Sequence, residues 1–179
     1  MKWSIKITKI AGIDFFIHST FFILILWIGF SYWITSQSIR AVIDGIVFIL
    51  LLFSFVLLHE LGHAIAAKKY GIATKDITLL PIGGLARLER MPKEPKQELL
   101  VALAGPMVNF IFAFIMFGWL IISNGLNGIT NITMTDGTLL QRLAIVNLSL
   151  LLFNLIPAFP MDGGKERLLK DILYFPFFW

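Results

Sequence analysis

Four long apolar stretches, separated by shorter polar segments, dominate the pattern of this sequence. They cover approximately residues 15–34, 41–67, 99–123 and 139–159. Each stretch is long enough to cross a bilayer as a helix, because about 20 apolar residues span the hydrocarbon core. The pattern therefore predicts an all-α integral membrane protein with about four transmembrane helices.

One segment after the second stretch does not fit a helix. Residues 75–90 contain β-branched residues, Pro81 and the pair Gly83-Gly84, and this combination breaks regular helices. We expect one or two short strands, or a small re-entrant β-hairpin. Such backbone is tolerated at membrane depth where protein or a water-filled cavity covers it. Residues 1–12 alternate between apolar and polar positions, which indicates a short strand or an interfacial segment.

The composition supports one membrane-embedded domain over residues 1–179. Hydrophobic residues make up 58% of the chain and charged residues 15%, and the mean hydropathy is +0.84. A soluble domain of this length needs more polar surface than that. The chain has no cysteine, so disulfides and thiolate ligands are excluded. Any transition metal must be held by His, Asp, Glu or water.

The basic residues indicate how the chain is oriented in the membrane. All 15 Lys and Arg residues except Arg40 and Arg142 lie in the N-terminal tail, in the loop 68–98 or after residue 164. Four spans bring these three segments to one side, and the positive-inside rule places that side in the cytoplasm. We therefore interpret the net charge of +4 as a sign of topology and expect no nucleic-acid partner. The prediction is a multi-pass cell-membrane protein with cytoplasmic termini.

Ionisable residues interrupt the last third of the second apolar stretch. His59, Glu60 and His63 form the pattern H-E-x-x-H. Residues four apart share one face of a helix, so both imidazoles can bind one zinc ion while Glu60 acts as a general base on water. The alternative is a chance match in a soluble core helix. Unpaired His and Glu side chains are costly in apolar surroundings, which favours the metal site.

A zinc site needs a third protein ligand, and few candidates remain in the chain. Asp162 follows the fourth apolar stretch, where Pro157 and Pro160 break the helix and two glycines come next. This irregular backbone could turn the carboxylate into the site. The alternative is that Asp162 caps the following helix.

Two further polar residues lie within apolar stretches. Asn109 follows Ala104-Gly105-Pro106, a segment that allows close helix packing. We expect Asn109 to make an interhelical hydrogen bond. His18 lies at the start of the first stretch, where an interfacial or capping role is the expectation.

These segments resemble those of the site-2 proteases, which are intramembrane zinc metalloproteases. The resemblance covers most of residues 58–164. It implies that His59, His63 and Asp162 hold one zinc ion and that Glu60 is the catalytic base. The segments that carry it are His59-Glu60-Leu61-Gly62-His63, Pro81-Ile82-Gly83-Gly84, Ala104-Gly105-Pro106-Met107-Val108-Asn109 and Asn154-Leu155-Ile156-Pro157-Ala158-Phe159-Pro160-Met161-Asp162-Gly163-Gly164.

The resemblance also suggests roles in substrate binding. It implies that Asn154 helps to hold substrate or the developing oxyanion, and that the strand near Gly83 and Gly84 pairs with an unwound substrate. Family members cleave transmembrane segments of membrane-bound regulatory proteins. The chain is similar to the compact branch without a PDZ insertion, and its end soon after Gly164 resembles a C-terminally truncated member.

Two other functions remain open from the sequence. A membrane metal transporter or metal-binding scaffold would also carry intramembrane His and Asp, and a truncated family remnant could bind partners without cleaving them. Two features favour the protease. The chain has one compact set of candidate ligands, and Glu60 has no obvious ligand role. The sequence does not define the substrate or the oligomeric state.

Overall fold

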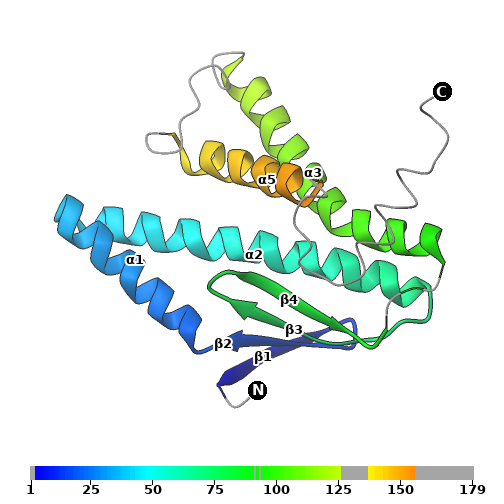
Figure 1. Cartoon of the computed structure of the whole chain (residues 1–179). Coiled ribbons are helices and arrows are strands. Elements are labelled where there is room, and N and C mark those ends of the chain that lie inside the picture. Colours follow the sequence, from blue (N-terminus) through cyan, green and yellow to red (C-terminus); the bar gives the residue numbers. More distant parts are fainter. Residues whose placement is uncertain (1–2, 91, 93, 126–136, 156–179) are drawn as a thin grey trace.

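A small sheet lies beside the C-terminal half of a long helix, and the other helices extend from this pair (Figure 1). The computed structural model describes residues 3–90, 92, 94–125 and 137–155. The elements in chain order are β1 (Ser4–Ile10), β2 (Ile13–His18), α1 (Thr20–Ser36), α2 (Ile39–Lys69), β3 (Thr74–Leu80), β4 (Gly83–Leu88), α3 (Pro95–Asn124) and α5 (Leu139–Leu155).

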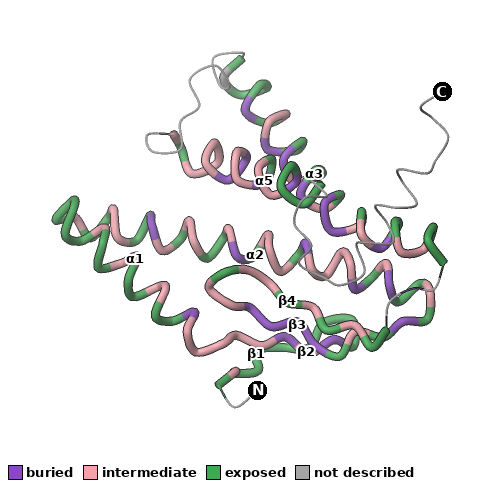
Figure 2. The backbone as a smooth tube through the Cα atoms, in the orientation of Figure 1, coloured by how far each residue is buried: buried purple, intermediate pink, exposed green. Residues whose placement is uncertain are grey.

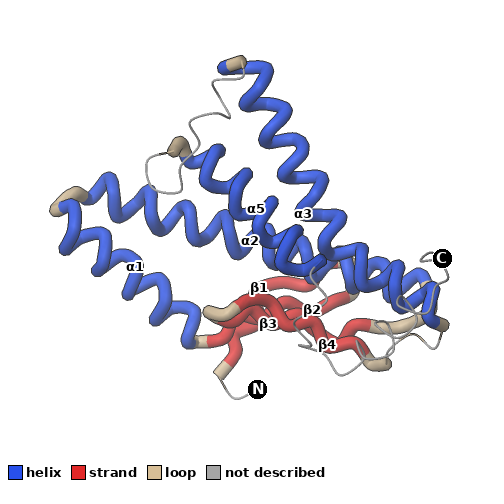
Figure 3. The backbone as a smooth tube through the Cα atoms, turned by 45° about the horizontal axis from the view of Figure 1, so that its top comes forward, coloured by secondary structure: helices blue, strands red, loops and turns tan. Residues whose placement is uncertain are grey.

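The sheet corrects the all-α prediction. Its strand order is β1-β2-β3-β4, and Figure 3 shows it at one end of the helices. Strands β1 and β2 form an antiparallel hairpin, as do β3 and β4, whereas β2 and β3 are parallel. Ala11 and Gly12 both have positive φ angles between β1 and β2, which is typical of a two-residue hairpin turn. The expected hairpin within residues 75–90 is present as β3 and β4.

The predicted start of the first helix, at residue 15, was wrong. Residues 15–18 belong to β2, and α1 begins at Thr20. Only His18, Ser19 and Thr20 separate the apolar residues of the strand from those of the helix, and periodicity cannot separate short apolar strands from helices. Besides β1, strand β2 pairs with β3, which comes much later in the chain. His18 is the last residue of β2, and its Nδ1 atom lies 2.7 Å from the hydroxyl oxygen of Thr20, the first residue of α1.

The other helices lie close to their predicted positions. Helix α2 has 31 residues and α3 has 30, against the predicted 41–67 and 99–123. Helix α5 begins at residue 139 as predicted. The rest of the predicted fourth span, residues 156–159, lies outside the described residues.

Helices α2 and α3 are long and apolar enough to cross a membrane. Only 11% of the most apolar window of α2, and 33% of that of α3, is buried in the protein. A core helix of a soluble protein would bury most of this surface. Figure 2 shows exposed and half-buried residues along most of both helices. Apolar side chains therefore cover much of the outer surface of α2 and α3. Helices α1 and α5 have 17 residues each, or about 25 Å.

Helix α2 packs against the sheet on one side and against α3 on the other. The fully buried Ala64 of α2 contacts a cluster formed with Ile13, Phe15 and Ile77 of the sheet. On the other side, a Cβ atom at Gly62 would lie 2.8 Å from the backbone oxygen of Ala104 in α3. The backbone of α3 therefore approaches α2 closely because residue 62 has no side chain.

We predict that Gly62→Ala destabilises the protein by about 1–3 kcal/mol, since the added methyl group must separate two packed backbones. The measurement is thermal unfolding in detergent. Gly118→Ala is the matched control, because a Cβ at this α3 position meets no described atom within 4 Å. Equal melting temperatures for the two variants would contradict the close packing of α2 and α3.

Candidate metal centre

Two imidazole rings converge near the middle of the helix packing. His59 and His63 lie one turn apart on α2, and their Nε2 atoms are 3.1 Å apart. His59 is buried, with 6% of its surface exposed, and His63 is half-buried. The H-E-x-x-H pattern therefore places both ring nitrogens at one point, as its spacing predicted.

Helix α3 holds both rings through their outer nitrogens. The Nδ1–H of His63 donates to the backbone oxygen of Val101 at 2.7 Å. The Nδ2 amide of Asn109 donates to Nδ1 of His59 at 3.1 Å, so Asn109 makes the expected interhelical hydrogen bond. Partners on the outer nitrogens orient histidines that ligate metals. These two contacts direct both Nε2 atoms toward each other.

A glycine on α3 makes room for one of the rings. A Cβ atom at Gly105 would overlap the imidazole of His63, contacting Nε2, Cδ2 and Cε1. Any larger residue at position 105 would therefore displace the ring or the helix. The segment Ala104-Gly105-Pro106 thus allows close packing, as predicted, and its glycine lies directly against a candidate ligand.

Glu60 lies on a different side of α2 from the histidines. A Cβ atom at Gly84 of β4 would lie 2.5 Å from Cγ of Glu60 and 3.3 Å from its Cδ. The glutamate side chain is half-buried and occupies the space that a side chain at position 84 would need. Gly84 therefore contacts the candidate base, a relation that the sequence did not reveal. Gly83 starts β4 with a positive φ of 142°.

Of the two remaining predicted site residues, Asn154 and Asp162, the structure describes only Asn154. Asn154 is exposed near the end of α5, and its Nδ2 donates to the backbone oxygen of Leu150 at 2.7 Å. Asp162 lies outside the described residues. Within the described part of the chain, no group of three His, Asp or Glu residues could hold a metal. This part supplies two imidazole nitrogens, a donor type that suits zinc.

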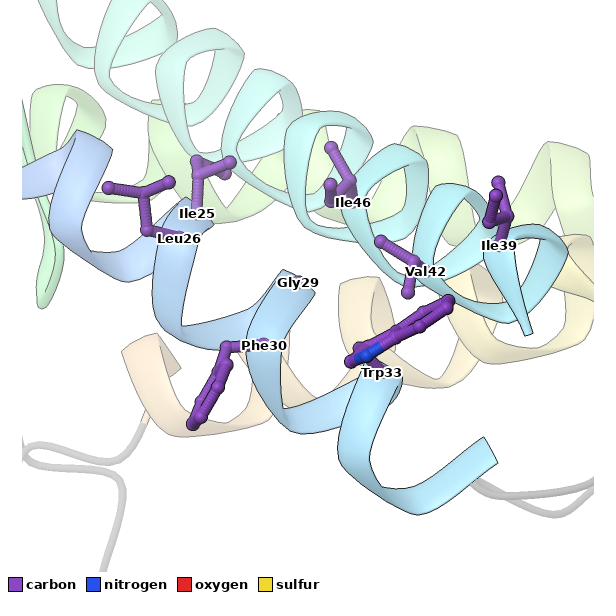
Figure 4. A pocket seen from close by; sticks show the side chains of 8 residues that line it. All are labelled: Ile25, Leu26, Gly29, Phe30, Trp33, Ile39, Val42 and Ile46. Atoms are coloured by element: carbon purple, nitrogen blue, oxygen red, sulfur yellow. The ribbon is translucent and has the colours of Figure 1, made fainter. Parts of the chain in front are cut away.

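An apolar groove between α1 and α2 offers no alternative site. Figure 4 shows its lining side chains, which carry no titratable group. The groove therefore offers apolar contacts but no acid, base or metal ligand. The lining residues are Ile25, Leu26, Gly29, Phe30, Trp33, Ile39, Val42 and Ile46.

Comparison with known proteins agrees with the fold. The sequence model of Peptidase family M50 matches residues 47–137, which include most of α2, the β3–β4 hairpin and α3. A solved structure of the site-2 protease from Methanocaldococcus jannaschii superposes with a TM-score of 0.66 at 41% identity. The superposition covers 96% of this chain and 72% of that one.

Curated relatives give the same assignment. The "Zinc metalloprotease MJ0392" of Methanocaldococcus jannaschii is 45% identical over 97% of this chain and 46% of its own length. Stage IV sporulation protein FB of Bacillus subtilis is 32% identical over 72% of this chain and 42% of its own length. The chain thus spans about half the length of the curated relatives it matches. It belongs to peptidase family M50, the site-2 protease family of zinc metalloproteases.

We predict that Gly105→Ala weakens zinc binding by about 10–100-fold, the usual effect of disturbing residues that orient a ligand. The added methyl group would displace the ring of His63. The measurement is competition for zinc with a chelator, using purified protein in detergent. Gly118→Ala, on the same helix but in open space, should bind zinc as the parent does. Equal zinc affinity for both variants would remove Gly105 from the metal site.

Proposed function

We propose that this chain is the catalytic part of a zinc-dependent intramembrane endopeptidase. The proposed substrates are transmembrane segments of membrane-bound regulatory proteins. One observation carries the proposal: the Nε2 atoms of His59 and His63 converge at 3.1 Å within a helix apolar enough to cross a membrane. Ionisable residues in such a helix are expensive and mark functional sites. Membership of a family of zinc metalloproteases supports the same function.

The proposed zinc ligands are His59, His63 and Asp162. When bound at such a site, zinc acidifies water and polarises a carbonyl group. The two histidines supply neutral imidazole nitrogens that α3 holds in place. Asp162 follows the helix of Asn154 closely in sequence, and its carboxylate completes the three-ligand set of catalytic zinc sites.

Glu60 is the proposed general base. It neighbours His59 in sequence but points about 100° away around the helix, toward β4. Its contact with Gly84 limits the positions that its carboxylate can take. A restrained carboxylate one residue away from a candidate ligand can accept a proton from the attacking water and return it to the leaving amine.

The proposed substrate-binding element is β4, with Gly83 and Gly84 at its start. Strand β4 is the last strand in the order β1-β2-β3-β4, so its outer edge has no partner strand among the described residues. A peptide bond in a transmembrane helix is shielded by the hydrogen bonds of that helix. An unwound substrate that adds a strand to this edge would satisfy its backbone there, next to Glu60. We assign Asn154 to substrate or oxyanion binding, since its amide has a second N–H besides the one donated to the oxygen of Leu150.

We propose that four helices cross the membrane, with the sheet on the cytoplasmic side. The turn between α1 and α2 lies far from the sheet (Figures 1 and 3). Most of the basic residues are in segments at the sheet end, and the positive-inside rule places that end in the cytoplasm.

We predict that Glu60→Gln retains zinc but lowers cleavage of a model transmembrane substrate by about 100-fold or more, the scale of a lost general base. The substitution keeps the size of the side chain and removes the base. His59→Ala is the matched control and should lose both zinc and cleavage. Zinc content and cleavage are measured on the same preparations.

This comparison also separates the protease from its alternatives. In a metal transporter, Glu60→Gln would change metal flux, and the parent would cut no peptide bond. In a protein that only binds partners, the parent would hold zinc without cleavage. A parent that binds zinc but leaves every transmembrane substrate of its relatives uncut would contradict the proposed activity.

We predict that single cysteines introduced at Gln37 and Glu89 react with a membrane-impermeant thiol reagent from opposite sides. Gln37 lies between α1 and α2, and Glu89 is exposed just after β4. The parent has no cysteine, so the labelling background is zero. Glu89→Cys should react from the cytoplasm and Gln37→Cys from outside. Reaction of both from one side would contradict the proposed topology.

A further inference from the structure

The side chain of Asn109 is buried in α3 and has one unused hydrogen-bonding atom. The residue has no exposed surface. Its Nδ2 amide donates to Nδ1 of His59, but its Oδ1 meets no hydrogen-bond donor in the described part of the chain. A buried acceptor without a donor is costly and calls for an explanation.

The hydrogen bonds around the two histidines form a chain with one direction. Because the oxygen of Val101 can only accept, Nδ1 of His63 carries a proton, and in the neutral ring Nε2 is then an acceptor. The Nε2–H of His59 then donates to Nε2 of His63 at 3.1 Å. His59 therefore accepts at Nδ1, where Asn109 donates. Every contact in this chain has one donor and one acceptor.

Coordination of a metal by both Nε2 atoms requires the other tautomer of His59. Its Nε2 must present a lone pair, so the single ring proton of the neutral imidazole must be on Nδ1. That N–H would then face the N–H of Asn109, donor against donor. A half-turn of the carboxamide about χ2 exchanges Nδ2 and Oδ1 at the same place, and the unused oxygen becomes the acceptor.

We propose that Asn109 is a positioning residue of the zinc site, whose carboxamide turns when the metal binds so that Oδ1 accepts the Nδ1–H of His59. The inference rests on the proposed zinc site at His59 and His63. The proton count of His59 does not change, because its ring proton moves from Nε2 to Nδ1 by exchange with water. Asn109 thus fixes the tautomer that exposes the ligating nitrogen.

The fold contains a second buried asparagine that serves as a control. Asn147 on α5 also has no exposed surface, and its Nδ2 donates to the backbone oxygen of Leu143 at 2.9 Å. Its Oδ1 likewise meets no donor among the described residues, but its amide bonds to a backbone oxygen and not to an imidazole. Substitution of Asn147 reports the general effect of removing a buried amide from the helix interface.

The test is zinc affinity by chelator competition, measured on the full chain in detergent for the parent, Asn109→Leu, Asn109→Asp and Asn147→Leu. Asn109→Leu keeps the approximate volume but has no acceptor, and it should bind zinc about 10–100-fold more weakly. Asn109→Asp keeps an oxygen at the position and should bind zinc nearly as the parent does. Asn147→Leu should also resemble the parent. If Asn109 acted through packing alone, Asn109→Asp would not bind zinc better than Asn109→Leu, because a buried carboxylate without a donor destabilises the protein more than a buried leucine does.

Three results would overturn the inference: parent-like zinc affinity in Asn109→Leu, equal loss in Asn109→Asp, or equal loss in Asn147→Leu. A parent that binds no zinc would instead refute the proposed function. A second measurement needs no leucine variant. In the parent with ¹⁵N-labelled asparagine, zinc should shift the side-chain amide signal of Asn109 and leave that of Asn147 unchanged. An Asn109 signal that zinc does not shift would also overturn the inference.

Discussion

The close contact between α2 and α3 is the constraint on which the rest of the site depends. Gly62 lets the backbone of α3 approach α2, and Gly105 leaves space for the ring of His63. At this short separation, two groups of α3 reach the outer ring nitrogens, namely the backbone oxygen of Val101 and the amide of Asn109. Packing and ligand orientation are therefore one feature, because α3 cannot move away without releasing both imidazoles.

Helix α2 also packs against the sheet, on the side that faces away from α3. Small and apolar residues of α2 pack on the sheet, and Glu60 occupies the space left by Gly84. The candidate ligands thus face α3 while the candidate base faces β4. One helix holds the ligands and the base at a fixed angle, and it places the base beside the strand edge that we propose for the substrate.

Local patterns in the sequence predicted much of this structure. The features that they did not predict depend on contacts between segments that are far apart in the sequence. The spacing of His59 and His63, the β3–β4 hairpin and the extents of α2 and α3 are local properties of the sequence. The parallel pairing of β2 with β3 joins distant segments and is not visible in the local pattern. Residues 15–18 were therefore predicted as the start of a helix. In the site, the contact of Gly84 with Glu60 also depends on tertiary packing. The hydrogen bond of Asn109 was expected, but its partner was not.

The central claim is that the described fold presents two imidazoles to one zinc ion. X-ray absorption at the zinc edge of the loaded protein tests it most directly, since the chain has no cysteine and sulfur ligands cannot complicate the spectrum. We predict two imidazole nitrogens at about 2.0–2.1 Å, with the remaining ligands being oxygen. A spectrum that requires fewer than two imidazoles would contradict the account.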